Sequence, residues 1–344
     1  MQLKSNAKNK AKTLLRRIMS FAHEVKQEVL NANIENECCK LAFLSAVIHS
    51  CGELIKRGKD IFVCLKTDME ELFSKVNDCL STLYGEKATI ERDEDNNINK
   101  LDRFVITLPI NVTKRILFDC GIAKFNLDNE FSLWVGLDEH ILESECCERS
   151  YVKGVFATAS TSNIVLNDEK GKNRTFSGYH WEFNFVDERF CDDFSSLLFK
   201  LGITNKKSKR KNLFVLYIKE ADKVSDLFAL VGAYKGLLRL QNEMAIREVR
   251  NNINRQNNCL NANITKTVNA SLRQVNAINK IQDTIGFESL PANLRELCLV
   301  RLANPEESLD NLTKLLSTTI TKSGINHQFN RLIKIAEKIE NNKL

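Results

Sequence analysis

An internal repeat constrains the fold of this chain more than any other feature of its sequence. The triplet Glu37-Cys38-Cys39 returns as Glu145-Cys146-Cys147, and a helix-like pattern follows each copy. Both copies then show a strand, an amphipathic helix ending at a glycine, a second strand and a short closing helix. The expected strands are residues 61–65 and 103–108 in the first copy and 179–186 and 213–218 in the second. The repeat therefore predicts a duplicated α/β domain with pseudo-two-fold symmetry.

Small residues recur every four positions in the helix that opens each copy: Ala42, Ala46 and Ser50 in the first, and Ser150, Gly154 and Thr158 in the second. On a helix this spacing places them on one stripe, where two backbones can approach more closely than leucine-sized side chains allow. We expect these two helices to pack on each other at the pseudo-dyad.

The composition favours long regular segments. Among 344 residues there are only 13 glycines and 3 prolines, which disfavours a turn-rich β-sandwich, and 43% of the residues are hydrophobic. The sequence has no apolar run long enough to span a bilayer and no secretory signal, so a cytoplasmic α+β protein is expected. A net charge of +6 permits a polyanionic partner without demanding one.

The eleven cysteines are expected to be reduced thiols in an intracellular chain of this size. The vicinal pairs Cys38-Cys39 and Cys146-Cys147 lack CxxC or Cys/His spacing, so no metal site is expected. The histidines are interpreted as core or surface residues, since no ligand-forming residue stands at a suitable spacing from His23, His49, His140 or His180. Without a Ser/His/Asp set, a phosphate-binding loop or a dinucleotide fingerprint, neither enzymatic activity nor a cofactor is expected.

The C-terminal segment is predicted to contain three helices. The first begins at Pro291, and Ser308 and Thr321 are candidate N-caps of the other two. The last helix has an apolar stripe at Ile325, Phe329, Leu332 and Ala336. Its opposite face is polar and basic, with Lys322, Ser323, Asn326, His327, Asn330, Arg331 and Lys334. This pattern is typical of a helix-turn-helix with a recognition helix, although a helical hairpin with a solvated basic face would look similar.

The charge distribution agrees with the DNA-binding interpretation. Residues 283–310 carry two basic and six acidic residues, a net charge of −4, whereas residues 311–344 carry six basic and two acidic residues, a net charge of +4. Upstream, the Asn-rich stretch 247–280 has a net charge of +5 and the spacing of one or two amphipathic helices. Gly324, near the start of the last helix, would permit close approach to a phosphate.

Secondary contacts to a DNA backbone are predicted at two other places. One is the Asn-rich stretch, and the other is a basic run at residues 206–211, which by default is a solvated loop. The candidates are Arg250, Arg255, Lys266, Lys207, Lys209 and Arg210.

The duplicated half resembles the LAGLIDADG homing endonuclease fold, with residues 44–52 and 152–160 in the places of the nine-residue motif. In active members of that family each motif supplies a carboxylate near its end, and the two carboxylates hold a divalent metal at the DNA. Here those positions are Cys51 and Ala159, and Glu53 has only Thr161 as its counterpart. The resemblance therefore implies a nuclease scaffold without the acids needed for cleavage.

The whole chain from Met19 resembles the bacterial WhiA family of sporulation and cell-division regulators. The resemblance is carried by residues 19–28, by Tyr151 to Phe156, by the Asn/Arg pattern from Arg250 to Asn263 and by Thr321 to His327. It implies a domain order of a basic extension or misassigned start at 1–18, LAGLIDADG-like repeats at 19–125 and 126–240, a helical linker at 241–285 and a helix-turn-helix domain at 286–344. One departure is Ala159-Ser160, where the family has Gly-Gly.

The resemblance implies a non-catalytic protein that binds double-stranded DNA and acts in cell division and chromosome segregation, with transcriptional regulation as a further role and a place at the nucleoid. Cell-division or transcription proteins are further candidate partners. The predicted DNA-binding residues are Thr321, Lys322, Ser323, Asn326, His327, Asn330, Arg331 and Lys334. Two alternatives stay open: a scaffold for division proteins with incidental DNA affinity, and a residual metal-dependent endonuclease.

Overall fold

A computed structural model of the chain describes residues 20–58, 60–92, 103–125, 131–134, 136–164, 166 and 178–341. The extension predicted at residues 1–18 lies outside these residues. The chain divides into two compact units, with the division between Ile246 and Arg247. No helix in the described part is long and apolar enough to cross a bilayer.

The first unit contains the predicted duplication. One copy consists of α3 (Glu37–Cys51), β1 (Gly52–Arg57), β2 (Asp60–Thr67), α4 (Glu70–Tyr84), β3 (Thr89–Arg92), β4 (Phe104–Thr107) and α5 (Ile110–Asp119). The other consists of α6 (Glu145–Ala159), β7 (Ser160–Ser162), β8 (Trp181–Phe185), α7 (Glu188–Lys200), β9 (Lys206–Arg210), β10 (Leu213–Ile218) and α8 (Ala221–Val231). The antiparallel sheets have the equivalent orders β1-β2-β4-β3 and β7-β8-β10-β9, which confirms the α/β duplication.

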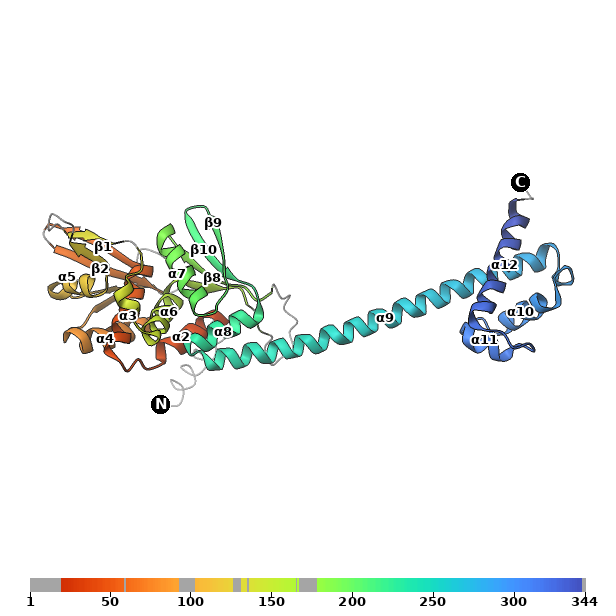
Figure 1. The fold of residues 1–344 in the computed structure, drawn as a ribbon, viewed down its shortest axis with the longest axis horizontal. Coiled ribbons are helices and arrows are strands. Elements are labelled where there is room, and N and C mark those ends of the chain that lie inside the picture. Colours follow the sequence, from red (N-terminus) through yellow and green to blue (C-terminus); the bar gives the residue numbers. More distant parts are fainter. Residues whose placement is uncertain are drawn as a thin grey trace, which may run out of the picture. The chain divides into compact units, whose positions relative to one another are not determined.

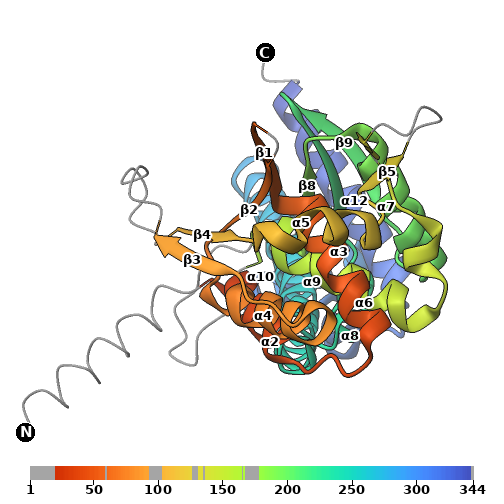
Figure 2. The same cartoon turned by 90° about the vertical axis from the view of Figure 1, so that its left-hand side faces the viewer.

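Helices α3 and α6 lie side by side between the two sheets (Figure 1 and Figure 2). Their contact uses the predicted small residues. A Cβ atom added to Gly154 would lie 2.6 Å from Ala46 Cβ and 2.8 Å from the Phe43 carbonyl oxygen. One turn further on, the hydroxyl oxygens of Ser50 and Thr158 are 2.5 Å apart. The two helices therefore touch almost backbone to backbone, as the spacing predicts.

Shorter elements complete the first unit. They are α2 (Phe21–Asn31), the two-stranded sheet of β5 (Ala123–Phe125) and β6 (Phe131–Leu133), and the 3-10 helix η1 (Glu139–Leu142). Glu28 of α2 accepts hydrogen bonds from the backbone N–H groups of Lys235 (2.7 Å) and Gly236 (3.0 Å). This carboxylate caps the start of α9 (Tyr234–Thr284), where free N–H groups favour an anion.

The second unit contains the end of α9, the 3-10 helix η2 (Phe287–Ser289), α10 (Ala292–Ala303), α11 (Leu309–Leu315) and α12 (Lys322–Asn341). Its core comprises Ala277, Ile278, Ile281, Leu290, Leu294, Leu297, Cys298, Leu312, Ile325, Phe329, Leu332 and Ala336. All four apolar positions predicted for the last helix are buried there, and Ser308 accepts the N-cap hydrogen bond of α11 from Asn311 N–H.

The Asn-rich stretch is helical, as its spacing predicts, and lies within one helix, α9. Its Val249, Ile253 and Leu260 are exposed, whereas Ile278 near its end is buried. The expectation of a solvated loop at the basic run was wrong, because Lys206–Arg210 forms β9 and pairs with β10 through the backbone.

A valine at position 154 should separate α3 from α6. We expect Gly154→Val to lower the free energy of unfolding of the first unit by about 1–3 kcal/mol, because the added atoms overlap Ala46 and the Phe43 carbonyl. Both tryptophans of the chain, Trp134 and Trp181, belong to this unit, so their fluorescence during urea unfolding reports on it alone. Arg149→Val, at an exposed position of the same helix, is the control. Equal stability of the two variants would contradict the packing argument.

His49, in the last turn of α3, lies against the second copy. Its Nδ1 is 3.0 Å from the Tyr151 hydroxyl, and its ring stacks on Phe190 with a centroid distance of 5.2 Å. Burial lowers the pKa of His49 to about 4, although the nearby Asp138 carboxylate acts in the opposite direction. The folded protein therefore favours the neutral imidazole.

The contribution of His49 to stability should be complete above its unfolded pKa of about 6.5 and should be lost as the pH falls toward about 4. The expected loss is at most about 3 kcal/mol. Tryptophan-monitored urea unfolding at a series of pH values measures it. His49→Gln should be less stable at pH 7 and should lose less stability over this interval; parallel pH profiles for the two proteins would rule out this role of His49.

Candidate nucleic-acid interface

The orientation of α12 follows from its buried stripe. Ile325, Phe329 and Leu332 are at most 1% exposed, so the opposite side of the helix faces solvent. All predicted DNA-binding residues are exposed: Thr321, Lys322, Ser323, Asn326, His327, Asn330, Arg331 and Lys334. The Thr321 hydroxyl accepts a hydrogen bond from Gly324 N–H at 3.2 Å, which caps the helix as predicted. The structure thus presents a continuous polar, basic helix face.

The turn before α12 is fixed from α10. The Glu296 carboxylate accepts hydrogen bonds from the backbone N–H (2.6 Å) and the hydroxyl (2.8 Å) of Ser317. These donors lower the pKa of Glu296. Lys322, the first residue of α12, forms an ion pair with Asp310 of α11 at 2.7 Å. The first contact attaches the turn to α10, and the second joins the start of α12 to α11.

Arg301 joins the other end of α11 to the core. This side chain is only 2% exposed and donates to the backbone carbonyl of Glu307 at 2.7 Å. Its guanidinium lies 5.2 Å from the centre of the Phe329 ring of α12, which places a buried cation on an aromatic face. Burial lowers the pKa of Arg301. The same residue therefore anchors the α10–α11 loop and packs against α12.

Gly324 has a packing role in the described structure. A Cβ atom at this position would lie 2.8 Å from Cγ1 of Ile320, in the turn that precedes α12. The small residue lets this turn fold closely onto the helix start. Access for a phosphate at Gly324 stays a prediction.

The secondary candidates for contacts with the DNA backbone differ in whether their charged groups already form ion pairs. Arg250, Arg255 and Lys266 are exposed on α9. On β9, Lys207 pairs with Glu188 (2.9 Å) and Asp192 (2.5 Å), and Arg210 pairs with Glu182 (3.0 Å). The ammonium group of Lys209 instead lies 4.9 Å from the centre of the Phe214 ring. Lys207 and Arg210 would have to leave carboxylate partners to reach a phosphate.

The two motif ends meet at the C-terminal ends of α3 and α6, where Cys51 and Ala159 are the last helical residues. The Cys51 thiol donates to the Val47 carbonyl oxygen, and burial raises its pKa to about 12. Nearby, Glu53 forms an ion pair with Lys66 at 2.8 Å. Among the described residues no group of three or more acidic or histidine side chains gathers here to hold a metal. Neither α3 nor α6 therefore ends in a carboxylate that could bind a divalent metal.

At the opposite end of the same two helices the structure joins residues that the sequence analysis had kept apart. The pairs Cys38-Cys39 and Cys146-Cys147 form one cluster in which the four sulfur atoms lie within 4.8 Å of one another. Their spacing along the chain matches no metal motif, and only the contact between α3 and α6 brings them together.

The fold and the α12 surface define a protein with a duplicated LAGLIDADG-like domain followed by a helix-turn-helix domain. Comparison with family models agrees: the WhiA N-terminal LAGLIDADG-like domain matches residues 37–123, the WhiA LAGLIDADG-like domain matches 148–250, and the WhiA C-terminal HTH domain matches 253–336. The chain belongs to the WhiA family.

Known relatives span nearly the whole chain. A protein of Clostridium botulinum named "Probable cell division protein WhiA" is 34% identical over 323 residues, which are 94% of this chain and 99% of that protein. A protein with the same name from Carboxydothermus hydrogenoformans is 34% identical over 95% of this chain and 100% of its own length. The crystal structure of full-length WhiA from Thermatoga maritima has 21% identity and a TM-score of 0.51, and covers 92% of this chain and 97% of that one.

Proposed function

We propose that this protein is a non-catalytic binder of double-stranded DNA that acts in cell division and chromosome segregation, and that it also regulates transcription. The observation that carries the proposal is the exposed polar, basic face of α12 in a helix-turn-helix domain. A place in the cytoplasm at the nucleoid follows from this function. Cell-division or transcription proteins are further proposed partners.

The proposed mode of binding places α12 in the major groove. Lys322, Ser323, Asn326 and His327 lie in its first two turns, the part of a recognition helix that reaches base edges. Asn330 and Arg331 extend this surface by another turn, where Arg331 is suited to a bidentate contact with guanine. Thr321 and Lys334 are assigned to phosphate contacts, and Arg250, Arg255, Lys266 and Lys209 to secondary contacts with the backbone.

Alanine at position 331 tests base reading. We expect Arg331→Ala to weaken binding of a target duplex by about 1–3 kcal/mol and to relax its sequence preference, whereas Lys334→Ala should weaken all duplexes alike. Fluorescence anisotropy with duplexes selected by the wild-type protein measures both effects. Lys114→Ala on α5 removes the same charge from an exposed site outside the proposed surface and is the control.

The same titrations at several salt concentrations separate the DNA binder from a scaffold with incidental DNA affinity. Contacts to several phosphates make the logarithm of the binding constant fall steeply with the logarithm of the salt concentration. A flat response, together with unchanged affinity in the α12 variants, would favour the scaffold.

The alternative of a residual nuclease makes an opposite prediction. With Cys51 and Ala159 at the motif ends, supercoiled plasmid incubated with the pure protein and Mg²⁺ or Mn²⁺ should stay uncut. Gel electrophoresis of the plasmid is the measurement, and an active LAGLIDADG endonuclease with its own target plasmid is the positive control. Metal-dependent cleavage that co-purifies with the protein would overturn the non-catalytic assignment.

A further inference from the structure

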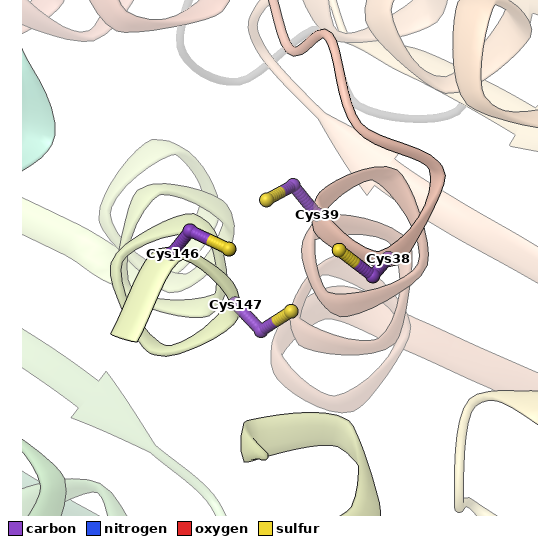
Figure 3. Close-up of side chains that lie close together, drawn as sticks. All are labelled: Cys38, Cys39, Cys146 and Cys147. Atoms are coloured by element: carbon purple, nitrogen blue, oxygen red, sulfur yellow. The ribbon is translucent and has the colours of Figure 1, made fainter. Parts of the chain in front are cut away.

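Four cysteines meet where α3 and α6 begin. Cys38 and Cys39 lie in the first turn of α3, and Cys146 and Cys147 occupy the equivalent positions in α6. Figure 3 shows the four side chains pointing into the space between the two helix ends. The sulfur atoms lie within 4.8 Å of one another, and all four are free thiols. We propose that these cysteines bind one Zn²⁺ ion, which joins the two halves of the domain at the pseudo-dyad.

The arrangement fits a single thiophilic ion. Zinc in structural sites is tetrahedral with sulfur at about 2.3 Å, which places neighbouring sulfur atoms roughly 3.8 Å apart. The sulfur atoms here lie within 4.8 Å of one another, so that spacing requires them to approach by about 1 Å at most. Four sulfur ligands select zinc over magnesium or calcium, which prefer oxygen. Cys39 and Cys147 are buried, whereas Cys38 and Cys146 are exposed and leave a path for the ion to enter.

Groups around the cluster already interact with the sulfur atoms. The Ser144 hydroxyl is 3.0 Å from Cys147 Sγ and 3.2 Å from Cys146 Sγ. Ser144 is the N-cap residue of α6, yet its side chain makes no capping hydrogen bond. Its hydroxyl is directed at the thiols instead, where it stabilises bound thiolates as an outer-shell donor. The positive ends of α3 and α6 favour bound thiolates in the same place, whereas burial raises the pKa of the metal-free Cys39 and Cys147 thiols.

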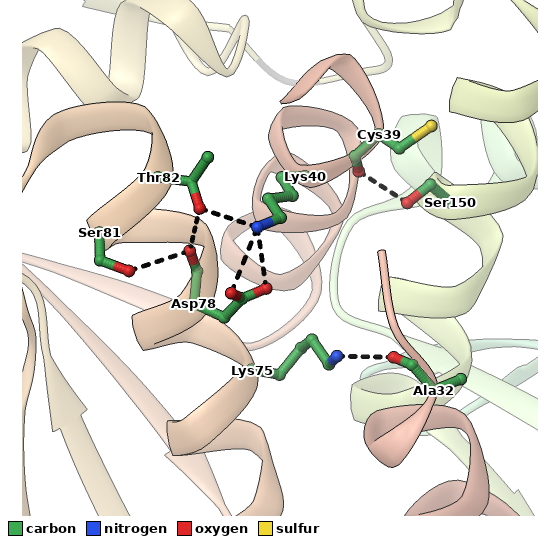
Figure 4. Close-up of polar contacts among 8 residues, drawn as sticks. All are labelled: Ala32, Cys39, Lys40, Lys75, Asp78, Ser81, Thr82 and Ser150. Carbon is green, nitrogen blue, oxygen red and sulfur yellow. Dashed lines mark hydrogen bonds and ion pairs between the residues drawn. The ribbon is translucent and has the colours of Figure 1, made fainter. Parts of the chain in front are cut away.

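The backbone that carries the cysteines is fixed by other contacts. Ser150 of α6 donates to the Cys39 carbonyl oxygen at 2.6 Å (Figure 4). Lys40, the next residue of α3, forms an ion pair with Asp78 at 3.1 Å and donates to Thr82 at 2.8 Å. Lys75, on the same helix α4 as Asp78 and Thr82, donates to the carbonyl oxygen of Ala32, in the segment that precedes α3. The site is therefore held in place by its surroundings before an ion arrives, which favours tight binding.

Metal binding by the reduced full-length protein tests the proposal. After treatment with a chelator under reducing conditions, the protein should bind one Co²⁺ ion per chain with the strong visible absorption of tetrahedral thiolate cobalt, and Zn²⁺ should displace it. Zinc should also raise the thermal midpoint of the tryptophan-monitored transition, and chelator should reverse this rise. Spectra without tetrahedral bands, or a protein that binds no zinc with all thiols titratable, would overturn the proposal.

Paired variants show whether the ion lies at this cluster. The double variant Cys38→Ser/Cys146→Ser replaces the two exposed ligands and keeps the buried Cys39 and Cys147, so that the core is unchanged. It should abolish stoichiometric metal binding. Cys259→Ser, at an exposed cysteine of α9, should bind as the wild type does. Far-ultraviolet circular dichroism confirms that both variants are folded. Unchanged binding in the double variant, or a mass showing disulfides among these cysteines in freshly purified protein, would reject the zinc site in favour of another location or of thiol redox chemistry.

Discussion

The contact between α3 and α6 is the interaction on which the first unit depends. Because Gly154 has no side chain, Ala46 and the Phe43 carbonyl can approach the backbone of α6 directly. Each helix also begins its own copy of the α/β repeat, so the contact sets the position of both sheets. A close helix crossing of this kind tolerates little change in volume, since the backbones themselves are the contact surface.

The two ends of this helix pair have different chemistry. At the C-terminal ends, the last helical residues are Cys51 and Ala159, and the hydroxyl groups of Ser50 and Thr158 make the contact between the helices. At the N-terminal ends, about 20 Å away by the rise of a 15-residue helix, four thiols converge. Among the described residues, the one group of three or more candidate metal ligands is thus the sulfur-rich one at the N-terminal ends.

Much of this architecture is predictable from local patterns. The repeat, the glycine at the end of α4, and the N-caps Ser308 and Thr321 all depend on residues close together in the chain, and each is found as expected. The burial of Ile325 and Phe329 follows in the same way from helical spacing.

What the sequence conceals depends on distant partners. The thiol cluster joins residues 108 positions apart, and no spacing rule for metal sites covers two vicinal pairs from separate repeats. The run Lys206–Arg210 has no apolar alternation and becomes a strand through backbone pairing with β10. Its Lys207 forms ion pairs with Glu188 and Asp192 of α7. In α9, the spacing left one or two helices open, but no glycine or proline occurs from residue 237 to 285, and a single helix continues to Thr284.

Asp310 competes with DNA for Lys322 of the proposed recognition helix, because the two residues form an ion pair. The Asp310 carboxylate pairs with the Lys322 ammonium group. A DNA phosphate that binds Lys322 therefore has to displace this carboxylate. An exposed pair of this kind is worth only about 0–1 kcal/mol, too little to block a well-matched duplex with many contacts. It is enough to lower the affinity for polyanions that make few other contacts with α12. Asp310 would thus weaken non-specific binding slightly.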